Sequence, residues 1–225
     1  MKLCHLYKSV LVGFVFFSAS ALSGAMTEEV VELQDEWARI KYLLPEKERE
    51  SAFRLLSEKA EKVSNAQQNN AEALVWEGII LSTYAGVKGG LGALGLAKKA
   101  RTLFEQAIEI DSAVMHGSAY TSLGSLYYQV PSWPVGFGDN DKALEYLTKG
   151  LQLNPDGIDS NYFYGDYLLQ KGDYIKAEEA FNKAMLAPAR EGREIADNGR
   201  RKEIEEALAK LKSQQAMAAR KNTLF

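Results

Sequence analysis

A pattern of small and aromatic residues recurs along this chain, and it constrains the fold more than any other feature. The clearest copy spans residues 165–188 and has a small residue first, then an aromatic, then an Ala-Phe-Ala spacing: Gly165, Tyr174, Ala177, Phe181, Ala184. Small residues let two antiparallel helices approach closely, and the aromatic residues fill the space where the next pair stacks. The pattern therefore predicts stacked pairs of helices.

Two further copies precede this one. In the first of these, Ala143 follows Gly124 by nineteen positions. In the clearest copy, Ala177 follows Gly165 by twelve. The longer spacing predicts an insertion at residues 130–139. The weaker copy has Gly78 and Phe104, with a second insertion near residues 84–96. Internal repetition of this kind is the mark of a solenoid.

These copies resemble the tetratricopeptide repeat (TPR), and the resemblance implies an all-α, TPR-like solenoid of helical hairpins. The rest of the chain is also predicted to be helical, since Leu33, Trp37, Ile40 and Leu44 recur on one helical face. We divide the chain into a signal peptide (residues 1–25), an N-terminal helical pair (26–70) and three TPR-like units (71–113, 114–157 and 158–189). A C-terminal capping helix with its tail (190–225) follows.

A glycine-rich segment within the weaker copy matches the pattern G-x-G-x-x-G at Gly90–Gly95. That pattern binds dinucleotides only when it follows a strand and opens a helix in a βαβ unit. Here it lies between two predicted helices, and no acidic residue follows in a second strand. We therefore predict a permissive turn, because glycine adopts backbone angles that other residues avoid.

The first 25 residues have the features of a cleavable signal peptide. Lys2 and Lys8 precede a short apolar run, and Ser23-Gly24-Ala25 is a small-x-small cleavage site. Cys4 lies before the apolar run rather than after it, so we predict no lipid attachment and no stable membrane anchor after cleavage. The expected location is the periplasm, with secretion beyond it as the alternative.

Composition excludes several classes of function for the mature chain. Cleavage removes two lysines and no acid, so the net charge of −3 becomes −5, which makes nucleic acid an unsuitable partner. Cys4 is the sole cysteine, and His116 is the sole histidine after residue 25. We therefore predict no metal site and no cofactor.

TPR-like units bind partners along the concave groove formed by the first helix of each unit. Alignment on the small residue predicts the groove-facing positions, which are mixed polar and aromatic: Glu72, Val75, Ile79, Ser82; Ser118, Thr121, Ser125, Tyr128; Asp159, Tyr162, Asp166, Leu169. They lack the Lys and Asn clamp that captures a peptide carboxylate in chaperone-binding relatives.

Aromatic residues gather around this predicted groove and in the 130–139 insertion. Tyrosine suits binding surfaces that are partly wet, because one end is apolar and the other polar. The insertion, with Pro131 and Pro134, is expected to fold back and close one end of the groove. The predicted partner-binding residues are Tyr120, Thr121, Tyr128, Trp133, Phe137, Tyr162 and Asp166.

The insertion is also loosely similar to that of periplasmic TPR proteins associated with TRAP transporters, and this resemblance implies an apolar cavity for a small ligand. Those proteins are typically lipoproteins, whereas this chain lacks the anchoring cysteine.

Three functions follow in order of support. The first is a non-catalytic module or scaffold that binds an envelope protein or peptide. The second is capture of a small apolar ligand in support of a TRAP-type transporter, and the third is an enzyme. The enzyme is least supported because Asp111, Asp141 and Asp159 are placed to cap helices. The arginines between 190 and 201 alternate with glutamates, which indicates pairing along a helix surface.

Overall fold

The computed structural model describes residues 26–222, and the predicted signal peptide lies outside them. The described part is all-α and confirms the expected fold class, a TPR-like solenoid. Its helices are α1 (Glu28–Leu43), α2 (Glu46–Ala66), α3 (Ala71–Lys88), α4 (Gly90–Ile110), α5 (Val114–Gln129), α6 (Asn140–Leu153), α7 (Ile158–Lys171), α8 (Tyr174–Met185) and α9 (Glu194–Asn222). Within this part, no helix is long and apolar enough to cross a membrane.

Successive helices pack as antiparallel pairs, and a glycine lies at the closest approach in three of them. Gly78 of α3 faces the ring of Phe104 in α4, Gly124 of α5 faces Leu147 in α6, and Gly165 of α7 faces Phe181 in α8. A side chain at any of these glycines would meet its neighbour within 3.0 Å. The three copies of the sequence pattern thus make the same contact. The division of the chain into units at 71, 114 and 158 stays an interpretation of the sequence.

The glycine-rich segment differs from its prediction. Instead of a long turn across residues 84–96, two helix ends meet at Gly89 and Gly90, whose φ angles of 63° and 62° are left-handed. The residues that follow are helical, because Ala93, Leu96 and Ala97 form an apolar stripe against the core. This burial outweighs the roughly 1 kcal/mol by which each helical glycine disfavours a helix. The segment follows helix α3, so it lacks the strand that a dinucleotide-binding loop requires.

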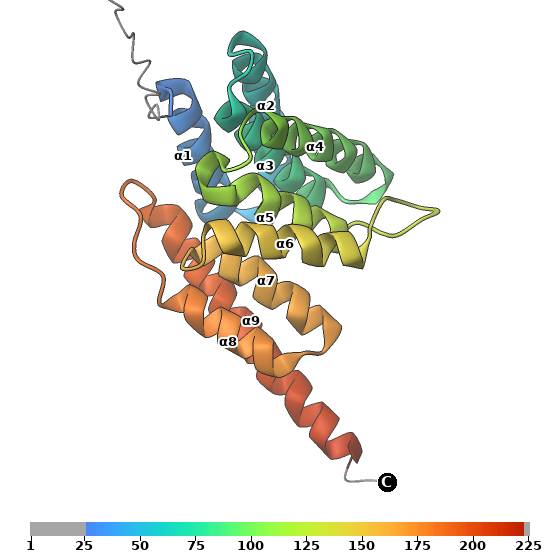
Figure 1. Cartoon of the computed structure of the whole chain (residues 1–225). Helices are drawn as coiled ribbons and strands as arrows, with labels where there is room; N and C mark the ends of the chain where they lie inside the picture. The colour runs from blue at the N-terminus through green and yellow to red at the C-terminus, as the bar shows by residue number, and fades with distance from the viewer. Residues whose placement is uncertain (1–25, 223–225) are drawn as a thin grey trace, which may run out of the picture.

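The insertion at 130–139 is a loop that projects from the ends of α5 and α6 (Figure 1). Two backbone hydrogen bonds hold its base. The amide of Asp139 donates to the carbonyl of Tyr127 (2.9 Å), and the amide of Gly138 donates to the carbonyl of Pro131 (3.0 Å). Phe137 packs edge-on against Tyr127. At the tip, Trp133 is 85% exposed.

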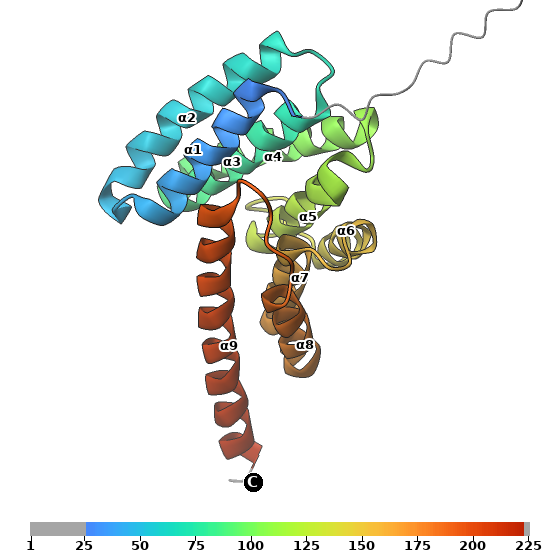
Figure 2. The ribbon, with the colours of Figure 1, turned by 90° about the vertical axis from the view of Figure 1, so that its left-hand side faces the viewer.

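The last helix does more than cap the final pair. Helix α9 begins at Glu194, four residues later than predicted, and runs beside α7 and α8 (Figure 2). Ile204 and Leu211 bury its inner face. Its first turns also pack against α1, where Gly199 lies directly against the ring of Tyr42. The first and the last of the described helices therefore contact each other.

Candidate functional site

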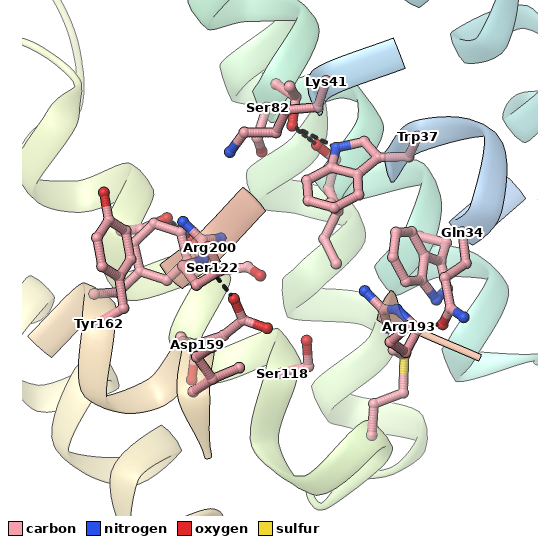
Figure 3. A pocket seen from close by; sticks show the side chains of 18 of the residues that line it. Gln34, Trp37, Lys41, Ser82, Ser118, Ser122, Asp159, Tyr162, Arg193 and Arg200 are labelled. Carbon is pink, nitrogen blue, oxygen red and sulfur yellow. Dashed lines mark hydrogen bonds and ion pairs between the residues drawn. The ribbon is translucent and has the colours of Figure 1, made fainter. Parts of the chain in front are cut away.

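A cavity of about 1100 Å³ lies on the concave side of the solenoid. Its walls come mainly from the first helix of each pair, α1, α3, α5 and α7, and from the segment that leads into α9. Figure 3 shows Gln34 and Arg193 on one side of it, Asp159, Arg200 and Tyr162 on the other, and Ser118 and Ser122 on α5. The arrival of α9 at α1 turns the expected open groove into a cavity with an additional wall.

Eight of the twelve predicted groove positions line this cavity: Glu72, Ile79, Ser82, Ser118, Thr121, Ser125, Asp159 and Tyr162. Val75, Tyr128, Asp166 and Leu169 do not. Thr121 and Tyr162 are thus the two residues of the predicted partner-binding set that the structure places in the wall. The Tyr162 ring lies beneath the Arg200 guanidinium, 4.3 Å from the Arg200 Cζ, and burial raises its pKa to about 12.

Tyr128 and Asp166 are placed elsewhere, in the contact between α5 and α7. The Tyr128 hydroxyl donates a hydrogen bond to Asp166 Oδ2 at 2.8 Å. Burial, and then the negative charge of Asp166, raise the pKa of Tyr128 well above its usual value. This pair joins two neighbouring helices rather than facing a ligand.

The other three predicted residues also lie away from the cavity. Tyr120 stacks on Tyr146 of α6, with ring centroids 6.1 Å apart. Phe137 is covered on one face by the guanidinium of Arg101, 4.7 Å away, and Trp133 is exposed at the loop tip. The loop therefore does not close the groove, because its one anchored aromatic residue packs back on its own base.

A cluster of charges that the sequence did not reveal fills the α9 side of the cavity. Asp159 accepts two hydrogen bonds of 2.8 Å, from Arg190 Nη1 and from Arg200 Nε. Arg190 also pairs with Asp197 at 2.6 Å. Arg200 pairs with Glu203, which in turn binds Lys41 Nζ of α1 at 3.0 Å. The cluster joins α7, α9 and α1.

The charges in this cluster fix the ionisation of its carboxylates. Burial alone would raise the pKa of Asp159, but the guanidinium groups of Arg200 and Arg190 lower it far below its usual range. The pKa of Glu203 is also lowered, since Arg200 and Lys41 outweigh the effect of burial. A carboxylate held ionised in this way cannot supply a proton near neutral pH.

The structure corrects three expectations from the sequence. Asp159 does not cap α7 but binds arginines. Asp139, rather than Asp141, caps α6, because its side chain accepts hydrogen bonds from two backbone amides. The arginines read as surface pairs include Arg200, whose side chain is only 5% exposed. Their burial depends on where α9 packs, which the local sequence pattern does not encode.

The comparisons with known proteins agree with this fold. The family model described as tetratricopeptide repeat matches residues 158–188, which form α7 and α8. No curated protein sequence matches the chain. The solved structure of a thermophilic TPR protein of Thermus thermophilus superimposes with a TM-score of 0.57, at 18% identity over 82% of each chain.

MamA is a more distant structural match, with a TM-score of 0.42 at 22% identity over 77% of this chain and 95% of its own. The helical pairs and the matched repeat define the class of fold: a TPR-like helical solenoid.

Proposed function

We propose that this protein is an exported, non-catalytic binding module whose cavity holds a short segment of an envelope protein. The observation that carries the proposal is the cavity of about 1100 Å³, to which the inner helices of all four pairs contribute. A concave surface made from successive repeats is the usual binding face of a solenoid. The absence of catalysis is supported by the carboxylates of Asp159 and Glu203, which are both engaged by cations.

Filling the cavity tests this function directly. Ser122 lines the cavity from α5, so Ser122→Trp would occupy the space of a bound segment. Thr102→Trp on the exposed face of α4 is the matched control. A partner that co-purifies from periplasmic extract with the wild type and the control, but not with Ser122→Trp, supports the proposal. Equal recovery with both variants contradicts it.

The proposed location has its own measurement. Cleavage after Ala25 predicts that the protein in the periplasmic fraction begins at Met26, which N-terminal sequencing reads directly. An unprocessed chain in the cytoplasmic fraction would contradict export.

A small-ligand function in support of a TRAP-type transporter is the second candidate. The contact of α9 with α1 favours it, because the extra wall makes the concave face more enclosed than an open groove. Native mass spectrometry of protein from the periplasm distinguishes the two, since a bound small molecule adds a defined mass and a polypeptide adds a far larger one.

A further inference from the structure

One arginine in the cavity wall lacks the partners that its neighbours have. Arg190 and Arg200 each bind two carboxylates, whereas Arg193 has no carboxylate within 4.0 Å among the described residues. Arg193 Nη1 donates a hydrogen bond to Oε1 of the neutral Gln34 at 2.9 Å. Its guanidinium also lies over the ring of Trp76, 5.3 Å from the centroid. A neutral amide and an indole ring therefore hold this cation in place.

The charges around Arg193 leave it uncompensated. Lys41, Arg190 and Arg200 are balanced by three carboxylates: Asp159, Asp197 and Glu203. Arg193 adds one positive charge to this balanced cluster. Its pKa is lowered, first by burial and then by Arg190. Arg193 also borders a shallow outer hollow with Asp35 and Glu36, and neither carboxylate is within 4.0 Å.

The indole of Trp76, beside Arg193, has a hydrogen-bond donor without an acceptor. Trp76 is 2% exposed, and its indole N–H has no hydrogen-bond partner within the described structure. The indole of Trp37, in contrast, donates to Thr83 Oγ1 at 2.9 Å. An unsatisfied buried donor is unfavourable by about 1–3 kcal/mol. Two hydrogen-bonding donor groups, the Arg193 guanidinium and the Trp76 indole, therefore lie together in this part of the cavity wall.

From these observations we propose that the cavity binds a carboxylate group, and that Arg193 is the residue that holds it. The planar fork of a guanidinium donates two parallel hydrogen bonds to a carboxylate. Gln34 fixes one Arg193 nitrogen, Trp76 supports the guanidinium plane, and the remaining N–H groups are available to the ligand.

The same charges select a singly charged group over a phosphate. The cluster supplies one uncompensated positive charge, and Asp159 lies in the same cavity with its side chain 35% exposed. A dianion would be repelled more strongly by this carboxylate than a singly charged group. The rest of the ligand would lie against Trp37 and Ile79, which also line the cavity.

This inference rests on the proposed function in one respect, namely that the cavity is the binding site. A carboxylate reaches the cavity from two sources, the C-terminus of a peptide or a free small organic acid. Both share the chemistry that Arg193 recognises, and the probes below separate them.

The test compares acids with neutral amides of the same shape. The first arm titrates the mature protein by calorimetry with a pool of tetrapeptides bearing free C-termini, and with the same pool amidated. The second arm uses phenylacetate and phenylacetamide. We expect at least one acid to bind roughly tenfold more tightly than its amide, as one charged hydrogen-bonded pair supplies.

Two variants connect this preference to the arginine. Arg193→Gln is expected to bind acid and amide equally, whereas Arg193→Lys keeps part of the preference because it keeps the charge. Arg54→Gln, an equal change of charge on the exposed face of α2, is expected to leave the preference intact. Circular dichroism of each variant confirms folding.

Each outcome decides the proposal. Equal binding of acids and amides by the wild type, no binding of any probe, or an unchanged preference in Arg193→Gln overturns it. Equal binding of free and amidated peptides, with no preference for phenylacetate over phenylacetamide, refutes this inference and leaves the protein-binding function standing. Binding of phenylacetate, but of no peptide, supports the proposed role of Arg193 as the carboxylate-binding residue. It favours the small-ligand function over the protein-binding one.

Discussion

Asp159 shows how one side chain sets the character of the cavity. The carboxylate lies in the first turn of α7 and binds two arginines from the last segment of the chain. Because its side chain is 35% exposed, its loss should be less severe than the 3–5 kcal/mol typical of a fully buried pair. Its ionised form nevertheless favours the folded state.

Asp159→Asn is therefore expected to lower the free energy of unfolding by about 2 kcal/mol at pH 7. The pKa of Asp159 is lower in the folded than in the unfolded chain, so its contribution is complete above about pH 4 and is lost as the pH falls further. Urea unfolding between pH 7 and pH 3 measures both effects. The variant should lose less stability on acidification than the wild type, and equal slopes would contradict this.

The helix glycines divide into those that a neighbour touches and those that face open space. A Cβ added at Gly124 would lie 2.8 Å from Leu147 Cγ and 2.9 Å from the Leu147 backbone nitrogen. Gly95 has nothing within 4 Å. We expect Gly124→Ala to destabilise the protein by about 2 kcal/mol, and Gly95→Ala to stabilise it by about 0.5–1 kcal/mol. Thermal unfolding checks both, and the same sign in the two variants would refute the assignment.

The sequence predicts the glycine contacts but misses the arginines for a clear reason. Gly124 and Gly165 occupy the same position in two repeats, and each contacts a residue of the next helix along the chain. Such a contact can be predicted from the repeat pattern alone. Arg193 and Gln34 are separated by 159 positions, and no pattern relates them. Two of the predicted binding residues, Tyr120 and Tyr128, do not face the groove. They pack between helices, where aromatic residues are commonly buried.

At the scale of elements, the loop at 130–139 separates into an anchored base and an exposed tip. Phe137 packs on Tyr127 and beneath Arg101, whereas Trp133 is surrounded by solvent. The prolines and aromatic residues predict a loop here, but they indicate neither that its tip points away from the groove nor which aromatic residue is the anchor.

Phe137→Ala is expected to lower the free energy of unfolding by about 2 kcal/mol, because it removes a half-buried ring and its aromatic contact. Trp133→Ala should change it by less than about 0.5 kcal/mol, as do most exposed substitutions. Chemical denaturation of both variants measures this difference. A larger loss in Trp133→Ala would mean that the tip makes contacts absent from the structure.

At the scale of the whole molecule, the contact between α1 and α9 determines the shape of the cavity. Gly199 lies against the Tyr42 ring, and Lys41 pairs with Glu203. These contacts join the N-terminal pair to the last helix, whereas each pair packs internally without them.

Gly199→Ala should therefore separate α9 from α1 and leave the helical pairs intact, because its new methyl group would overlap the Tyr42 ring. Hydrogen exchange is expected to rise in α1 and in the first turns of α9, with little change in α5 and α6. Gly95→Ala is the control. A uniform rise across all helices would show that the substitution unfolds the protein instead of opening this contact.

The contact between α1 and α9 also determines when the cavity forms during folding. Neighbouring helices contact each other over short separations, so each pair has the information it needs soon after it leaves the ribosome. Tyr42 and Glu203, in contrast, are 161 positions apart. The helical pairs can therefore form before α9 packs against α1, whereas the wall that α9 adds to the cavity cannot. The proposed binding site is complete only after this long-range contact has formed.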